Sequence, residues 1–181
     1  VFVHGYQFGT GLSATGNFVL NITCAPLCLP VPGNDICASA TSLTVDAPAL
    51  IGTNTCAAAT VGNPSCESAF ATLPDVFYSF TASPGGTNLI TFNLYTATNL
   101  GYAIYSSCGG TEIACNGGVT SGTTYTHSSL TGGNTYWVRV WTDDVTTGTF
   151  DIQVNQPCQP AATRTAVADC ANGQFFIDVN V

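Results

Sequence analysis

Hydrophobic and polar residues alternate with a period of two along most of this chain. In the segment 75–80, Val76, Tyr78 and Phe80 fall on one face, and Asp75, Phe77 and Ser79 fall on the other. Alternation of this kind is typical of a β-strand with one face in a hydrophobic core. The same pattern predicts strands at 41–45, 88–95, 101–107, 124–130, 135–141 and 149–154. We expect the last two of these segments to form a hairpin.

The predicted strands are short and are separated by glycine-rich turns such as "SPGGT" and "LTGGNT". The stretch from Leu130 to Val138 also fits the L-x-x-G-x-x-Y-x-V pattern of a tyrosine corner, in which the Tyr136 hydroxyl would bond to the loop before its strand. Many short strands, with few good helix formers between them, predict an all-β fold. We expect an antiparallel β-sandwich with jelly-roll-like topology.

Two stretches of the chain have the same order of residues. Thr15-Gly16-x-Phe18-x-Leu20-x-Ile22 parallels the segment 147–154, and each is followed by a cysteine, Cys24 and Cys158. The opening stretch is therefore interpreted as the end of a preceding repeat, and we expect the chain to be an excerpt from a longer secreted polypeptide. The predicted organisation is a closing hairpin at 1–24, a proline-containing linker at 25–33, a complete repeat at 34–158, and a linker with the first strand of another module at 159–181.

Charge excludes several classes of partner. The chain has ten acidic residues, only two arginines and no lysine, which gives a formal net charge of −8. A surface of this kind cannot neutralise a phosphate backbone, and it is repelled by anionic lipid. No apolar run is long enough to span a bilayer. We therefore expect neither nucleic-acid binding nor direct membrane insertion.

The nine cysteines indicate disulfides in an oxidising compartment, because no C-x-x-C doublet or histidine pair accompanies them. Cys108 and Cys115 flank a short segment between strands and are the first expected pair. Cys56 with Cys66 is a plausible second pair, which leaves Cys37 for Cys158 or for a cysteine of the linker. Spacing alone does not decide the connectivity.

No catalytic motif accompanies the two histidines. His4 lies in the opening segment, and His127 lies on a Thr/Ser-rich strand, where we interpret it as a solvated residue. The sequence has no G-x-S-x-G or H-E-x-x-H motif, and its acidic residues are scattered rather than paired. We therefore predict that the protein is not an enzyme.

One aromatic strip is a candidate carbohydrate-binding site. If Tyr136 and its alternate neighbours face the core, Trp137, Arg139 and Trp141 share the opposite face. Flat indole rings on either side of a guanidinium suit the apolar faces of sugar rings. The alternative is that Arg139 stacks on a tryptophan and a loop covers the remainder of the face.

Calcium is the only cofactor for which the sequence offers candidates, since it prefers oxygen ligands. The candidate ligands are Asp35, Asp75, Asp143 and Asp144. They lack the spacing of an EF-hand, and acidic turns are commonly just solvated. The alternative is that no metal binds.

Four motifs resemble a repeat of secreted multidomain proteins of Bacteroidetes. The stretch 34–40 is similar to N-D-x-C-x-x-A, 75–80 to D-V-W-Y-S-F, 105–115 to Y-S-G-S-C-G followed by I-A-C, and 130–140 to L-T-x-G-x-T-Y-Y-V-R-V. These repeats resemble the pre-peptidase C-terminal type of β-sandwich. Family members often carry an acidic run where this chain has Asn116-Gly117-Gly118, and this difference weakens the calcium hypothesis. The final segment, 167–181, resembles the start of an Ig-like module.

The resemblance implies a non-enzymatic structural or adhesive segment of a large modular protein at the bacterial cell surface, for example a filamentous adhesin of gliding motility. It also implies export by the type 9 secretion system. The expected partners are neighbouring modules of the same chain, surface glycans or other copies. The alternatives are a carbohydrate-binding module and an accessory domain of a secreted hydrolase.

Overall fold

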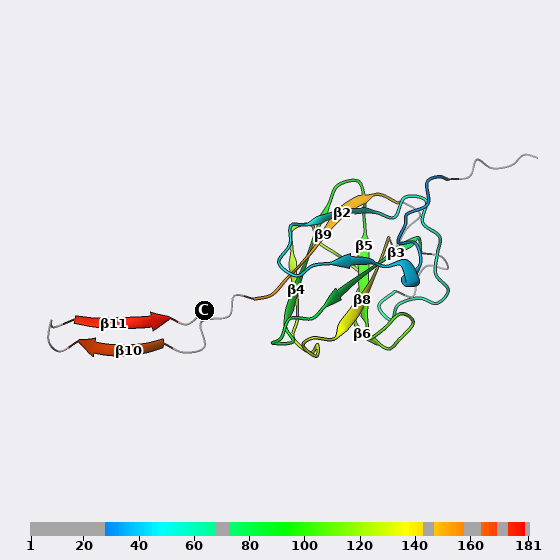
Figure 1. Ribbon diagram of the computed structural model, residues 1–181. Helices are drawn as coiled ribbons and strands as arrows, with labels where there is room; N and C mark the ends of the chain where they lie inside the picture. Colours follow the sequence, from blue (N-terminus) through cyan, green and yellow to red (C-terminus); the bar gives the residue numbers. More distant parts are fainter. Residues whose placement is uncertain (1–27, 68–72, 143–146, 158–163, 170–173, 180–181) are drawn as a thin grey trace, which may run out of the picture.

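A computed structural model describes residues 28–67, 73–142, 147–157, 164–169 and 174–179. Its main body is a sandwich of two sheets (Figure 1). The five-stranded sheet has the order β1 (Thr41–Leu43), β3 (Asp75–Thr81), β8 (Thr135–Thr142), β5 (Leu100–Tyr105) and β6 (Glu112–Asn116). The four-stranded sheet has the order β2 (Leu50–Thr53), β9 (Thr149–Asn155), β4 (Asn88–Leu94) and β7 (Thr124–His127). The predicted all-β sandwich is confirmed.

The period-two alternation places the core between the sheets. Val76, Tyr78 and Phe80 of β3 are buried against residues of the other sheet such as Phe92 and Phe150. Burying each large apolar side chain contributes on the order of 2 kcal/mol. The pairing is antiparallel except for β1, which lies parallel to β3. Beside the strands, the described residues of the main body include a short 3-10 helix, η1 (Cys37–Ser39). No helix in the described ranges has the length and hydrophobicity of a membrane span.

The prediction that β8 and β9 form a hairpin is wrong. β8 lies between β3 and β5 in the five-stranded sheet, and β9 lies between β2 and β4 in the other sheet. Each of them is a central strand whose two edges are paired with strands distant in sequence, so the chain crosses from sheet to sheet between them. The strands β2 and β6 were not predicted. Both are edge strands, and neither contains a buried residue.

The tyrosine corner is present as predicted. The backbone N–H of Thr131 donates to the Tyr136 hydroxyl over 2.8 Å, and Leu130 is buried beside it. The Tyr136 side chain of β8 therefore holds in place the loop that precedes the strand.

A separate antiparallel hairpin is formed by β10 (Arg164–Asp169) and β11 (Gln174–Val179). The predicted strand of the last segment corresponds to β11, whereas β10 was not predicted. The proposed hairpin at 1–24 lies outside the described residues, and the module boundaries at 34 and 158 stay predictions.

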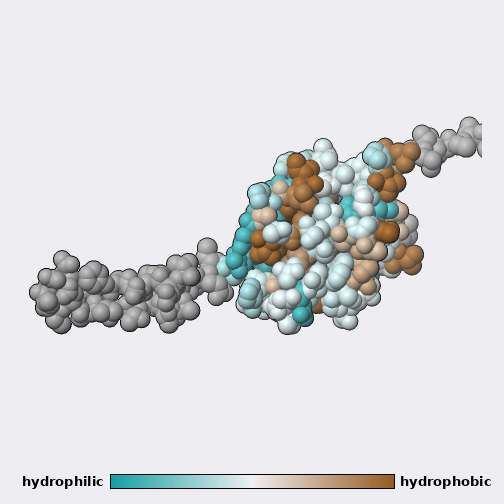
Figure 2. Space-filling model, in the orientation of Figure 1, coloured by the Kyte–Doolittle hydropathy of each residue, from teal (hydrophilic) through white to brown (hydrophobic). Residues whose placement is uncertain are grey.

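Figure 2 shows hydrophobic residues at several places on the surface of the sandwich, one of them where the described chain begins. The exposed hydrophobic residues include Leu29 and Val31 near that beginning, and Leu50 and Ile51 on β2. β2 forms one edge of its sheet, so its outer side has no strand partner among the described residues.

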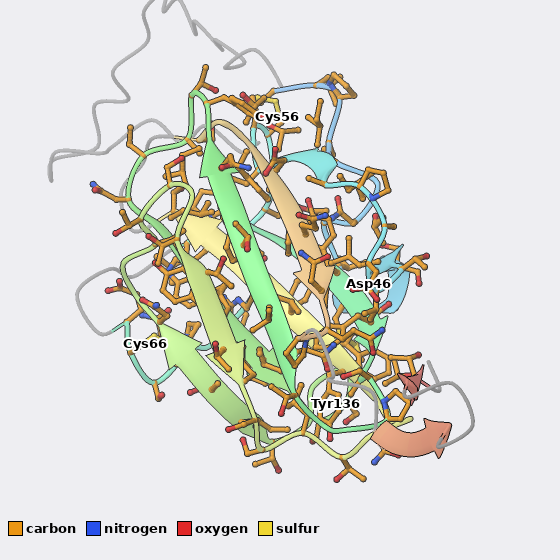
Figure 3. The ribbon with its side chains drawn as sticks, turned by 90° about the vertical axis from the view of Figure 1, so that its left-hand side faces the viewer. Asp46, Cys56, Cys66 and Tyr136 are labelled. Atoms are coloured by element: carbon orange, nitrogen blue, oxygen red, sulfur yellow. A yellow bond between two sulfur atoms is a disulfide. The ribbon has the colours of Figure 1, made fainter. Side chains whose placement is uncertain are left out.

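The described chain enters and leaves the sandwich at opposite ends. Cys28 is bonded to Cys56, which lies three residues after the end of β2, and this end of β2 pairs with the start of β9. The chain leaves after Asn155, at the other end of β9. Figure 3 shows Cys56 at one end of the sandwich and Tyr136 at the other. The seven residues of β9 thus separate entry from exit by roughly 20 Å.

Candidate functional site

The outer face of the five-stranded sheet carries the predicted aromatic strip. Tyr136, Val138 and Val140 lie in the core, so Trp137, Arg139 and Trp141 point away from it, as the alternation predicts. Part of the face is nevertheless covered by the segment 54–67, which we call the covering loop and which is bonded to Arg139 and to β6. Arg139 is 4% exposed and Trp141 is 0% exposed.

Trp141 is sealed and cannot serve as a binding platform, which corrects one part of the predicted strip. It packs against Leu73 and Ala103. Gly101 lies opposite it on β5, where an added Cβ would come within 2.6 Å of the indole ring. Glycine at this position therefore leaves the space in which the indole lies. The indole N–H has no hydrogen-bond partner in the described part of the chain.

Arg139 holds the covering loop on the sheet. Its guanidinium contacts the Asp75 carboxylate at 2.5 and 2.6 Å, and its other N–H groups donate to the carbonyl oxygens of Gly62 and Thr60 over 2.7 and 3.1 Å. The Thr60 hydroxyl also donates to Asp75 over 2.9 Å. Burial raises the pKa of Asp75, while the Arg139 charge and the Thr60 bonds offset part of that rise. The alternative reading had two parts, and the part in which a loop covers this face fits the bonds from Arg139 to the covering loop. Stacking of Arg139 on a tryptophan stays a prediction.

An open cavity of about 380 Å³ remains beside Trp137. Phe77, Tyr105 and Trp137 form its aromatic wall, and Arg139 lies among its lining residues. Phe77 is buried, while Trp137 and Tyr105 are half-buried. The rim is formed by residues 60–63 of the covering loop on one side and by residues 107–110 of the β5–β6 hairpin on the other. This cavity is the candidate binding site.

Further contacts fix the covering loop beside the cavity. Glu112 of β6 accepts a bond from the Tyr105 hydroxyl over 3.2 Å and another from the backbone N–H of Ser65 over 3.0 Å. The Ser65 hydroxyl donates to the same carboxylate. Burial, and then the Glu112 charge, raise the pKa of Tyr105 to about 12. Tyr105 is therefore neutral at physiological pH.

The disulfides differ from the predicted pairs. The structure joins Cys28 to Cys56, Cys37 to Cys108 and Cys66 to Cys115. Cys115 lies inside β6 opposite Ala103, whereas Cys108 lies in the hairpin loop beyond Tyr105, so the two are separated along the hairpin. Each observed bridge closes a longer loop than Cys108–Cys115 would, and each is expected to contribute on the order of 4 kcal/mol by restricting the unfolded chain. Cys158 lies outside the described residues.

The structure does not gather the predicted calcium ligands. Asp75 is engaged by Arg139, and Asp35 accepts a bond from the backbone N–H of Ala58 over 2.6 Å. Asp143 and Asp144 lie outside the described residues. Within the described ranges, no three His, Cys, Asp or Glu side chains come together in a way that suits a metal ion. Calcium binding stays a prediction.

His127 is not the solvated residue that the sequence suggested. It lies half-buried on β7, and its Nε2 is 2.9 Å from the hydroxyl of Tyr102, which reaches across from the other sheet. Burial lowers the pKa of His127. The other histidine, His4, lies outside the described residues.

Sequence reasoning found Trp137 and Arg139 but missed Phe77, Tyr105 and the glycine-containing rim loops of the cavity. Phe77 and Tyr105 occupy outward positions of the predicted alternation, and aromatic residues at such positions were the available signal. The rim loops had no signal, because their approach depends on the Cys37–Cys108 bridge and on Arg139.

Two solved structures that match this chain have low sequence identity to it. The pre-peptidase C-terminal domain of a collagenase from Bacillus anthracis is 12% identical, with a TM-score of 0.44, and the match covers 64% of this chain and 93% of that one. PliG of Aeromonas hydrophila, a periplasmic inhibitor of g-type lysozyme, is also 12% identical, with a TM-score of 0.38 over 63% of this chain and 96% of its own. The search of curated proteins found no match.

A family model described as galactose-binding-domain-like, and associated with type 9 secretion, matches residues 33–154. This association and the three disulfides indicate an exported protein, periplasmic or extracellular. The match also supports a non-catalytic surface domain. Because it spans two thirds of the chain and coincides with the sandwich, the chain belongs to the family of galactose-binding-like domains associated with type 9 secretion.

Proposed function

We propose that this chain is a non-enzymatic structural and adhesive segment of a large modular protein at the bacterial cell surface, and that its sandwich carries tension between neighbouring modules. Export by the type 9 secretion system is part of this proposal. The observation that carries it is the position of the two ends of the sandwich, because the chain enters beside Cys56 and leaves after Asn155. Modules joined through such ends form an extended string.

The pairing of β2 with β9 suits this role. The two strands are antiparallel, so the end of β2 that is tied to the entry and the end of β9 that leads to the exit lie at opposite ends of the ladder. Tension between entry and exit therefore pulls the strands past each other. All ladder bonds bear the load together in this geometry, whereas pulling from one end would break them one after another.

Three bridges reinforce the entry side. Cys28–Cys56 fastens the incoming chain to the end of β2, and Cys66–Cys115 fastens the covering loop to β6. Cys37–Cys108 joins η1 to the β5–β6 hairpin loop. Tension breaks hydrogen bonds far more easily than a covalent disulfide. The three bridges therefore protect the first half of the domain from being unfolded by tension.

Exposed apolar side chains support contact with a neighbouring module. Leu29 and Val31 lie at the entry, where a preceding module would attach (Figure 2). Burying them against such a module would restrict the angle between neighbours and would stabilise an extended arrangement.

A chromosomal in-frame deletion of residues 28–157 in the source bacterium tests the proposal. We expect the shortened protein still to be exported, and attachment of cells to surfaces under flow to fall. The control strain carries Tyr95→Ala, which changes an exposed side chain directly after β4 of the four-stranded sheet. This strain should attach normally. Surface labelling of intact cells measures export. Unchanged attachment, or loss of a secreted hydrolase activity in its place, would contradict the proposal and favour an accessory domain.

A further inference from the structure

The cavity beside Trp137 has a rigid aromatic wall. Phe77, Trp137 and Tyr105 come from the adjacent strands β3, β8 and β5, and Tyr105 lies directly opposite Trp137 in the sheet register. Its volume of about 380 Å³ is within the range of small-molecule sites. Since the rings stand on paired strands, a ligand that stacks on them pays little to order its site.

Its two rims are also held in place before any ligand arrives. The Cys37–Cys108 bridge fixes the hairpin loop, and the bond from Arg139 to the Gly62 carbonyl fixes the covering loop. Gly62 and Gly109 at the rims have positive φ values of 88° and 71°, a conformation that glycine adopts without strain. The opening between the rims is thus a preformed feature of the fold.

The electrostatics of the cavity favour a neutral ligand. Arg139 is the one charged residue in the described lining, and its charge is compensated by the contact with Asp75 at 2.5 Å. Its N–H groups are also used by carbonyl oxygens of the loop. The chain as a whole carries a formal charge of −8, which repels anions. Carboxylated and sulfated ligands therefore gain little here.

The lining of the cavity favours a ligand with an apolar face and polar edges. Its wall is aromatic, while the polar residues Ser107 and Asn63 belong to the two rim loops. A pyranose ring has an apolar face that stacks on an indole or a phenol and hydroxyl groups around its edge that reach such a rim. We propose that this cavity binds a neutral pyranose sugar of a surface glycan, with the ring stacked on Trp137 and Tyr105. This inference rests on the adhesive function proposed above and supplies its ligand class.

The two tryptophans of the chain make a direct binding assay possible. Trp141 is 0% exposed, so of the two tryptophans only Trp137 is open to direct contact with a ligand, and the Trp137→Ala variant assigns the emission change. The protein is titrated with neutral cello-, manno- and galacto-oligosaccharides and, as an anionic comparison, with oligogalacturonate. We expect a saturable emission change with at least one neutral series and none with oligogalacturonate.

Variants then assign the binding to the cavity. Calorimetry with the same sugars should show that Trp137→Ala and Tyr105→Ala each weaken binding by about tenfold or more, as expected for the loss of a stacking face. Trp137→Phe keeps a smaller ring and should bind with intermediate affinity. Tyr95→Ala, which removes an aromatic ring that is 60% exposed outside the cavity, should bind like the parent protein. Thermal melts establish that each variant is folded.

Three results would overturn the inference: no saturable binding of any neutral series, equal affinity in a folded Trp137→Ala variant, or preference for the anionic sugar. Shielding of Trp137 from acrylamide without sugar binding would show that a protein segment occupies the cavity, and would also overturn it. None of these results bears on whether the sandwich carries tension between modules, which force spectroscopy measures. The sugar-binding proposal and the proposed function can therefore be refuted independently.

Discussion

Pulling on the sandwich at residues 28 and 157 should release much less chain when its disulfides are intact than after reduction. The three bridges overlap along the sequence, so tension that enters at Cys28 passes to Cys56, runs to Cys66 and then passes to Cys115. With the bridges intact, the extensible chain between Cys28 and Cys115 is only the stretch of about 10 residues from Cys56 to Cys66. With the bridges reduced, the whole stretch lengthens.

The magnitude follows from the contour length of a residue. Reduction frees about 77 further residues, which at roughly 3.4 Å each correspond to about 260 Å of additional extension. Removing single bridges has unequal effects. Without Cys66–Cys115 the shortest covalent route runs along the chain from Cys28 to Cys37, across to Cys108 and on to Cys115, which adds about 6 residues or about 20 Å. Without Cys37–Cys108 the shortest route is unchanged.

Single-molecule force spectroscopy on a chain tethered at residues 28 and 157 measures these lengths. The parent protein is pulled with and without reductant, beside a Cys66→Ala/Cys115→Ala variant and a Cys37→Ala/Cys108→Ala variant as the matched control. Equal extension of the oxidised and reduced protein would refute the interlocked arrangement. A longer extension of the control variant would refute the order of the bridges.

Three further predictions concern stability. Tyr136→Phe leaves the backbone N–H of Thr131 without its partner and should lower the free energy of unfolding by about 1–2 kcal/mol in urea titrations, with the strands intact by circular dichroism. Arg139→Met leaves the Asp75 carboxylate buried without its counter-ion and should lower the free energy of unfolding by about 3–5 kcal/mol at neutral pH. Adding Asp75→Asn should recover part of that loss, and equal stability of the single and double variants would contradict this. Burial lowers the pKa of His127, so the unfolded chain binds the proton more readily than the folded protein does. The free energy of unfolding should therefore fall as the pH drops from about 6.5 toward the lowered pKa, and this contribution should level off below it. In melts at a series of pH values, His127→Gln should remove this slope.

At the candidate site, the local sequence pattern predicted some features correctly and could not predict others. The alternation in 135–141 placed Trp137 and Arg139 outside the core, and both do line the outer face of the sheet. It could not tell that Trp141, on the same face, would be sealed beneath Leu73 while Trp137 stays open. A period of two separates the faces of a strand, but it does not say which distant segment covers a face.

The pairing of the cysteines in disulfides could likewise not be predicted from their spacing in the sequence. Cys108 and Cys115 are neighbours in sequence, yet the hairpin register places them apart and brings each beside a cysteine far along the chain. The same is true of β8 and β9, which follow one another but pair with strands from elsewhere.

By itself, the sequence determined the strand-rich class, the inward faces of β3, β4, β5, β8 and β9, and the tyrosine corner at Tyr136. These features depend on side chains a few residues apart, so a linear pattern contains them. Only the tertiary structure decided the sheet order, the three bridges, the pairing of Arg139 with Asp75 and the cavity that remains beside Trp137. Each of these joins residues that are distant along the chain, and their proximity exists only once the two sheets have packed.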